Sequence, residues 1–208
     1  MDSMFTVFLV DDEERVLKGL SRLLKANGYD VWPFTSAQEY LEQHDPSIPG
    51  CAVLDVSMPG LDGLALQQIL AAGDIQLPII FLTGKGDIPT SVRAMKAGAI
   101  DFLTKPAEDK DLLNAIARAE IDDAKARQIG AELAAIKAKI ATLTHREREV
   151  LSHVVAGRLN KQIAGDLGTV EKTIKVHRGR MMEKLGVRSV ADLVRLAEKA
   201  GLSASAKS

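Results

Sequence analysis

The sequence predicts two folded parts: a doubly wound α/β domain with a five-stranded parallel sheet, followed by an all-α domain of four helices. Two observations lead to this prediction. Over residues 1–120, five short apolar runs alternate with segments of helical periodicity. From Thr144 onward, every apolar segment has helical spacing, and glycines separate the segments. We place the first domain at residues 1–120, a helical linker at 121–141 and the helical domain at 142–208.

The formal charge also divides the chain, although its total is only −1. Residues 1–141 carry a balance of −7, and residues 142–208 carry a balance of +6. A basic domain can bind a polyanion, which an acidic domain would repel. The two parts are therefore expected to have different partners.

Strand and helix signals alternate through the first domain. We expect strands at residues 5–10, around Val31, and at 51–54, 77–82 and 100–103. Helices are expected at 14–26, from Ser36, at 64–72, at 89–97 and from Asp109. Ser36 and Glu39 have the spacing of a capping box. Because crossovers between parallel strands are right-handed, the strands should form one parallel sheet with helices on both faces.

The linker is rich in alanine, lysine and acidic residues and contains no proline, which predicts a helix that continues the last helix of the first domain. Gly130 is a candidate break in it. Ile129, Leu133, Ile136 and Ile140 fall on one side of that helix. This stripe fits packing against the chain's own domains and a dimer seam equally well, because two heptads are too few to decide.

Four helices are expected in the last part, at residues 144–156, 160–167, 171–185 and 189–200. Thr144 and Glu147 form a capping-box pair at the start of the first. The helix at 171–185 divides into two faces. Its apolar face is suited to packing and carries Ile174, Met181 and Leu185. Most of another face is basic or small and carries Lys172, Lys175, Val176, Gly179 and Arg180. A helix that reads the major groove of DNA needs this division.

Several classes of protein are disfavoured by composition. No apolar run approaches the length of a membrane span, so no membrane partner is expected. Residues 1–10 lack a basic leader and a small-residue cleavage site, so we expect no signal peptide and a cytoplasmic protein. The single cysteine, Cys51, lies in an apolar strand and is expected to be a packed, inert thiol.

The most informative residues follow the predicted strands. In a doubly wound sheet the working groups lie at the carboxyl ends of the strands. Reading off those ends gives Asp11, Asp12, Asp55, Thr83 and Lys105. Three crowded carboxylates repel one another unless a cation lies among them, and oxygen ligands at strand ends suit Mg²⁺. A carboxylate beside Mg²⁺ can attack a phosphoryl donor and become an acyl phosphate.

The first part of the chain resembles the receiver domains of response regulators, which have a flavodoxin-like fold. The matching segments are VFLVDDE (7–13), VLDVSMPGLDG (53–63), FLTGKGD (81–87) and AGAIDFLTKP (97–106). The resemblance is strongest to the FixJ-type branch of two-component regulators. It implies that Asp55 accepts a phosphoryl group from a sensor histidine kinase.

The resemblance also implies roles for the surrounding residues. Asp12 and Asp55 would ligate Mg²⁺ directly, Asp11 through water, and Ser57 through its main-chain carbonyl. Lys105 would pair with the phosphate and precede a cis proline, Pro106.

A switch is implied as well, formed by Thr83, Gly84 and Phe102. Thr83 would move toward the phosphate, Gly84 would leave room for its oxygens, and Phe102 would rotate inward. The face formed by residues 88–103 would then change shape, and we hypothesise that it forms a homodimer interface. The alternative outcome of phosphorylation is that the receiver releases the C-terminal domain.

Residues 143–195 resemble the LuxR-type helix-turn-helix, which implies binding to double-stranded DNA. Lys161, Lys172, Arg178 and Arg180 are candidates for phosphate contacts, whereas Lys175 and Val176 are candidates for base contacts. The full set of DNA-binding candidates also contains Thr169, Thr173 and Gly179. Gly179 departs from the family, which often has a polar side chain there. Val170 stands where the family usually has serine and cannot cap the helix. Two alternatives follow: Thr169 substitutes as the cap at an offset of one residue, or the first turn of the helix is looser.

Together these features predict a transcription regulator that is not an enzyme, switched by phosphorylation at Asp55 with Mg²⁺, with RNA polymerase as a further candidate partner. Two other classes stay open. One is a metal-dependent phosphohydrolase that uses an aspartyl phosphate, although Val56 and Ser57 follow Asp55 where such an enzyme usually has a second carboxylate. The other is a phosphorelay or scaffold protein whose basic domain binds protein.

Overall fold

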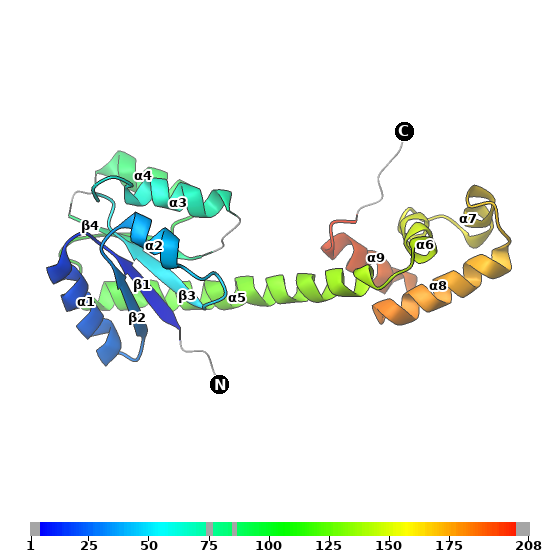
Figure 1. The fold of residues 1–208 in the computed structure, drawn as a ribbon, viewed down its shortest axis with the longest axis horizontal. Helices are drawn as coiled ribbons and strands as arrows, with labels where there is room; N and C mark the ends of the chain where they lie inside the picture. Colours follow the sequence, from blue (N-terminus) through cyan, green and yellow to red (C-terminus); the bar gives the residue numbers. More distant parts are fainter. Residues whose placement is uncertain (1–4, 74–76, 85–86, 203–208) are drawn as a thin grey trace. The chain divides into compact units, whose positions relative to one another are not determined.

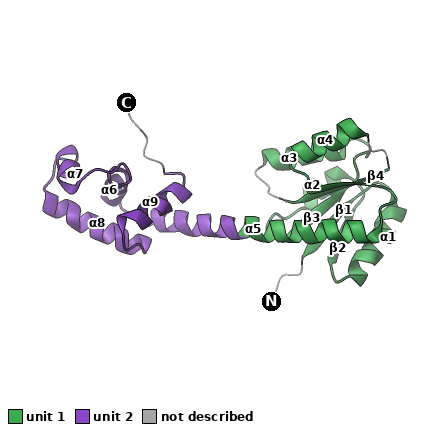
Figure 2. Ribbon diagram, turned by 180° about the vertical axis from the view of Figure 1, so that it is seen from behind, with its two compact units in different colours: residues 1–127 green, residues 128–208 purple. Residues whose placement is uncertain are grey.

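The computed structural model describes residues 5–73, 77–84 and 87–202, which form two compact units. Unit 1 comprises residues 1–127 and unit 2 comprises residues 128–208 (Figure 1, Figure 2). One long helix, α5 (Asp109–Ala141), contributes its first part to unit 1 and its last part to unit 2. Each unit has its own hydrophobic core and is described separately below.

Unit 1 is built on a five-stranded sheet in which all paired strands are parallel. The strands are β1 (Thr6–Val10), β2 (Asp30–Phe34), β3 (Gly50–Leu54), β4 (Ile79–Thr83) and β5 (Asp101–Thr104). Their order in the sheet is β2-β1-β3-β4-β5. Because the order reverses between β1 and β3, the loops after these strands diverge and leave a crevice at their carboxyl ends. This arrangement confirms the predicted doubly wound fold.

Helices cover both faces of this sheet (Figure 1). On one face lie α2 (Ala37–Gln43), α3 (Gly63–Ala72) and α4 (Ile88–Lys96), whose core residues include Tyr40, Leu66 and Ala94. On the other face lie α1 (Glu14–Ala26) and the first part of α5, with Leu24 and Ile116. Because helices cover both faces of the sheet, the central strands consist mainly of apolar residues.

The central strands are buried along their whole length, since a parallel sheet with two covered faces exposes neither side of these strands. Cys51 is fully buried in β3, and burial raises the pKa of its thiol. This confirms a packed thiol that favours the protonated, unreactive form.

Local differences from the sequence prediction have clear causes. The Ser36 hydroxyl accepts the Glu39 N–H at 3.1 Å, as predicted, but the Glu39 carboxylate accepts from Thr35 rather than from the Ser36 N–H. The predicted break at Gly130 is wrong, because α5 continues through it. One glycine costs about 1 kcal/mol in a helix, which the surrounding helix-favouring residues outweigh. Among the helices in the described ranges, α5 included, no stretch combines the length and apolar character of a membrane span.

Unit 2 contains residues 128–141 of α5 followed by α6 (His145–Val155), α7 (Asn160–Asp166), α8 (Glu171–Leu185) and α9 (Val190–Lys199). The predicted capping box at the start of α6 is formed: the Glu147 N–H donates to Thr144 Oγ1, and the Thr144 N–H donates to the Glu147 carboxylate. The core gathers apolar side chains from every helix, including Val150, Ile163 and Leu193. Ile140, from the predicted stripe, packs against this core, whereas Ile129 is exposed.

Candidate functional site

Main-chain hydrogen bonds at the carboxyl edge of the sheet hold the predicted acidic residues in place. The Asp55 N–H donates to the carbonyl of Val10 at 2.9 Å, and the Asp11 N–H donates to the carbonyl of Phe34 at 3.1 Å. Each residue therefore extends the hydrogen-bonding ladder by one step beyond the end of its strand. Since β1 and β3 are neighbours in register, the loops after them bring their carboxylates together.

Three carboxylates form the acidic cluster: Asp11, Asp12 and Asp55 each offer an oxygen, and these oxygens lie within 4.8 Å of one another. Asp11 and Asp55 are buried, whereas Asp12 is exposed. Burial raises the pKa of Asp11, even though hydrogen bonds from Lys105 and the Glu13 N–H oppose that effect. A buried carboxylate with this shift is incompletely compensated by protein groups. Oxygen donors and partial exposure are what Mg²⁺ requires, since it keeps several waters, so the residues present fit this ion.

Lys105 supplies the cation at the same edge. Its ammonium lies 2.6 Å from Asp11 Oδ2, 3.2 Å from Asp55 Oδ2 and 3.6 Å from Glu13 Oε1. The Lys105 N–H donates to the carbonyl of Thr83 at 2.8 Å, which places the residue after β5. Burial alone would lower the pKa of Lys105, but its contacts with Asp11 and Asp55 outweigh this and raise it. The expected cis peptide between Lys105 and Pro106 is present.

Two residues at this edge of the sheet, Gly63 and Glu13, were not singled out from the sequence. Gly63 begins α3 so close to Asp55 that an added Cβ would lie 2.2 Å from the Asp55 carbonyl oxygen. Only glycine fits this contact, and its place at the end of the VLDVSMPGLDG segment was the available signal. Glu13, which faces Lys105, gave no signal beyond its position after Asp11 and Asp12. Ser57 is exposed, and its N–H donates to Asp55 Oδ1 at 3.3 Å.

The three predicted switch residues lie on β4, directly after it, and on β5. Thr83 ends β4 and is fully buried, whereas Gly84 is exposed and an added Cβ there would meet nothing within 4 Å among the described atoms. Lys85 and Gly86 of the same motif lie outside the described residues. Phe102 is half-buried, and its ring lies 6.0 Å from that of Phe81, centroid to centroid. Phe102 thus borders the core on the side of α4.

In unit 2, α8 has the two faces expected from the sequence. Ile174, Met181 and Leu185 are almost completely buried in the core. The opposite face is exposed and carries Lys172, Lys175, Val176, Gly179 and Arg180. Lys161, at the start of α7, is exposed too. At Gly179 an added Cβ would meet nothing within 4 Å in the described part of the chain, so the helix surface is open there.

The start of α8 and the side chain of Arg178 differ from simple expectation. Val170 is the N-cap residue, and no side chain caps the helix, so the substitution of Thr169 as cap is wrong. The carbonyl of Ala164 accepts from the Thr169 N–H at 2.9 Å, which holds this residue in the turn before the cap position. Arg178 is half-buried and donates to Asn160 Oδ1 at 2.9 Å, which links α8 to α7.

An α/β unit with this acid–lysine edge, joined to a helical unit with an exposed basic helix, defines the class of phosphorylation-controlled DNA-binding regulators. Two family models match: "Response regulator receiver domain" over residues 7–117 and "Bacterial regulatory proteins, luxR family" over residues 141–197. The chain belongs to the response regulator family and combines a receiver domain with a LuxR-type DNA-binding domain.

Relatives along nearly the whole chain agree with this membership. The chain is 45% identical to nodulation protein W of Bradyrhizobium diazoefficiens, over 96% of this chain and 88% of that protein. It is 42% identical to the transcriptional regulatory protein FixJ of Rhizobium meliloti, over 97% and 98%. The relatives that match along nearly the whole chain include several proteins named as transcriptional regulators.

Solved structures lead to the same family. The low-resolution structure of the response regulator StyR matches with a TM-score of 0.81 and 47% identity, covering 94% of this chain and 99% of that one. Full-length FixJ from B. japonicum matches with a TM-score of 0.56 and 38% identity, covering 95% and 98%. A receiver domain with a LuxR-type domain implies a histidine kinase and DNA as partners, and receiver domains bind Mg²⁺ at an acidic cluster of the kind formed here by Asp11, Asp12 and Asp55.

Proposed function

We propose that Asp55 is the phosphoacceptor and that its phosphorylation switches dimerisation and DNA binding. One observation carries this proposal: the Lys105 ammonium lies within 3.2 Å of the carboxylates of both Asp11 and Asp55, beside the exposed carboxylate of Asp12. A carboxylate oxygen of Asp55 forms the new O–P bond while the P–N bond of a phosphohistidine in the kinase breaks and its imidazole leaves. Lys105 is placed to balance charge on the transferred group.

Mg²⁺, when bound, supplies positive charge to the oxygens of the transferred group. We assign Asp12 and Asp55 as direct ligands, Asp11 as a ligand through water, and the Ser57 carbonyl as a further oxygen donor. The grouping of one oxygen from each of Asp11, Asp12 and Asp55 within 4.8 Å of one another supports a shared ion at this place. The Ser57 N–H already donates to Asp55, which helps to hold the carboxylate in one orientation.

Thr83, Gly84 and Phe102 are proposed to couple the phosphoryl group to the surface. The phosphoryl oxygens recruit the Thr83 hydroxyl, and Gly84 offers no side chain in their way. The movement of Thr83 makes room into which Phe102 rotates from its half-buried position. Residues 88–103 then change shape and form the homodimer interface. The exposed apolar side chains of Ile88, Val92 and Met95 on α4 support an interface there.

DNA binding is assigned to α8 and the residues around its start. We propose phosphate contacts for Lys161, Lys172, Arg178 and Arg180, base contacts for Lys175 and Val176, and further contacts for Thr169, Thr173 and Gly179. The exposure of most of these residues supports the assignment. A dimer is needed because one small reader offers limited contact area.

The domain boundaries are proposed at residues 1–120, 121–141 and 142–208, with the middle segment acting as a helical linker. The continuity of α5 through residues 109–141 supports a helical linker. We assign the protein to the cytoplasm, where both DNA and the kinase are accessible, and propose RNA polymerase as a further partner. A regulator of this kind needs no catalytic turnover of its own.

Incubation with acetyl phosphate and Mg²⁺ tests the phosphoacceptor assignment. Wild type should gain about 80 Da, the mass of one phosphoryl group, and Asp55→Asn should gain none. A gain of equal size in the variant would reject Asp55 as the acceptor. Steady release of inorganic phosphate from an excess of small phosphate esters, far beyond one equivalent, would instead support the phosphohydrolase alternative.

A further inference from the structure

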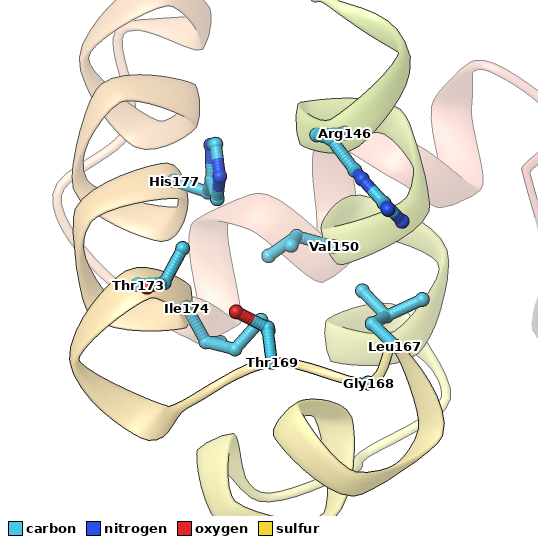
Figure 3. A pocket seen from close by; sticks show the side chains of 8 residues that line it. All are labelled: Arg146, Val150, Leu167, Gly168, Thr169, Thr173, Ile174 and His177. Atoms are coloured by element: carbon cyan, nitrogen blue, oxygen red, sulfur yellow. The ribbon is translucent and has the colours of Figure 1, made fainter.

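A polar pocket of about 160 Å³ lies in unit 2 between α6, α8 and the turn that joins α7 to α8 (Figure 3). Thr173 and His177 lie on its α8 side, Arg146 borders the α6 side, and Thr169 lies at the base. Val150 forms part of the apolar wall behind them. Arg146 was not among the DNA-binding candidates found from the sequence.

The pocket borders the face of α8 assigned to DNA. Thr173 and His177 are four residues apart and therefore lie on the same side of the helix. That side falls between the buried face, which includes Ile174, and the exposed face, which includes Lys172 and Val176. When a helix lies in the major groove, its flanks approach the phosphate backbones on either side of the groove. A pocket on the flank is thus placed for a phosphate rather than for a base.

The polar side chains around the pocket include hydrogen-bond donors that are not fully used within the protein. Arg146 is exposed, and one of its terminal nitrogens donates to Glu149 at 2.8 Å. A guanidinium has five N–H groups, so this ion pair orients Arg146 and leaves other donors available. Within the described residues, the hydroxyls of Thr169 and Thr173 have no hydrogen-bond partner. No side chain caps the start of α8, so no side chain accepts a hydrogen bond from the main-chain N–H groups of its first turn.

The geometry points to a seat for one phosphate of the DNA backbone, with Arg146 as its cationic contact and the hydroxyl of Thr169, which points into the pocket in Figure 3, as a neutral donor. A phosphate oxygen only accepts hydrogen bonds, which matches a pocket edge made of donors. This contact comes from α6 as well as α8, so it fixes how far α8 enters the groove. The inference rests on the proposed binding of DNA and adds Arg146 to it.

Binding of the full-length protein, treated with acetyl phosphate and Mg²⁺, to two duplexes of unrelated sequence tests this seat over a series of salt concentrations. Arg146→Ala and Arg146→Gln should reduce the slope of log K against log salt by about 0.9 for each DNA-binding domain bound. Arg146→Lys should keep most of the slope, because it keeps the charge. Thr169→Val should weaken binding without a change of slope.

Arg195→Ala is the matched control, because it removes one exposed arginine of unit 2 that lies on α9, outside the pocket. It should leave the slope unchanged, and thermal melting should show that Arg146→Ala is folded. An unchanged slope for Arg146→Ala, or a loss confined to one of the two sequences, would overturn the phosphate seat. Wild type that binds neither duplex at any salt concentration would instead reject DNA binding itself, which is a different result.

Discussion

The ammonium of Lys105 lies 3.2 Å from Oδ2 of Asp55, although 50 residues separate the two in the chain. The same ammonium contacts Asp11 at 2.6 Å. Two buried carboxylates that directly follow β1 and β3 thus share one cation from the residue that follows β5. The loops after β1, β3 and β5 therefore bring the carboxylates and the ammonium of the site together.

Replacing Lys105 by methionine keeps an unbranched side chain that is shorter only by the terminal nitrogen, and it removes this cation. We expect the rate of phosphorylation by acetyl phosphate to fall by about 100-fold, because a preorganised charge no longer stabilises the transferred group. The rate is measured as the growth of the phosphorylated mass with time. Lys18→Met, on α1, removes an ammonium whose ion-pair partner among the described residues is exposed Glu14, and this variant should react like wild type. Equal rates for the two variants would contradict the role of Lys105.

Removal of Mg²⁺ should destabilise unit 1. A ligand that binds only the folded state stabilises it by about 1.4 kcal/mol at ten times its Kd. We expect urea unfolding of wild type to require more urea with Mg²⁺ than with a chelator. Asp12→Asn should remove most of this difference and leave the stability without Mg²⁺ almost unchanged, since Asp12 is exposed. A full Mg²⁺ effect in the variant would show that the ion binds elsewhere.

The stability of unit 1 should also depend on His44. Both ring nitrogens of His44 are buried without a hydrogen-bond partner among the described residues, and the ring stacks on Tyr40 at 4.8 Å. Burial lowers the pKa of His44 below 6.5; Asp45 opposes this shift, and the charge of Arg127 adds to it. The folded state therefore favours the neutral ring. The contribution of the neutral ring to the free energy of unfolding is fully present above pH 6.5. It is lost as the pH falls below 6.5, by up to about 1.4 kcal/mol per pH unit for one proton.

His44→Phe tests this dependence, since phenylalanine can fill the place beside Tyr40 and Phe8 without a titrating group. The variant should be more stable at neutral pH by about 1–3 kcal/mol, because a buried polar group without a partner is removed. The loss of stability just below pH 6.5 should disappear. Urea unfolding at several pH values measures both effects, and parallel curves for wild type and variant would refute the role of His44.

Arg127 joins α5 to the loop before β3. Its Nε donates to the buried carboxylate of Asp123 at 2.8 Å, and its terminal nitrogens donate to the carbonyls of Pro46, Ser47 and Ile48. Arg127→Ala would leave a buried carboxylate without its cation. We expect it to destabilise unit 1 by about 3 kcal/mol, measured by urea unfolding.

The neighbouring pair of Lys125 and Asp122 provides the comparison. It lies on the same helix, is exposed, and has a separation of 3.6 Å. Lys125→Ala should cost less than about 0.5 kcal/mol, because exposed ion pairs contribute little. If the two variants lost equal stability, Arg127 would have no special role in holding α5.

The acidic edge was predictable from the sequence because parallel strands end on one side, so strand ends could be read without knowing any contact. The capping box of Thr144 and Glu147 was predictable because it depends on residues three apart. The contacts of Arg127 were not, since they join residues about 80 positions apart, and three of its acceptors are main-chain carbonyls with no sequence signal. The break predicted at Gly130 was wrong because the free-energy cost of one glycine is small against the helix-favouring residues in the rest of α5.

The most direct test of the central claim compares DNA affinity with and without phosphorylation in wild type and Asp55→Asn. At fixed salt, acetyl phosphate with Mg²⁺ should raise the affinity of wild type for DNA by about 5–150-fold, the usual range for coupling between two sites. The affinity of Asp55→Asn should not respond. A wild type whose affinity stays constant while its mass shows full phosphorylation would contradict control of DNA binding by Asp55.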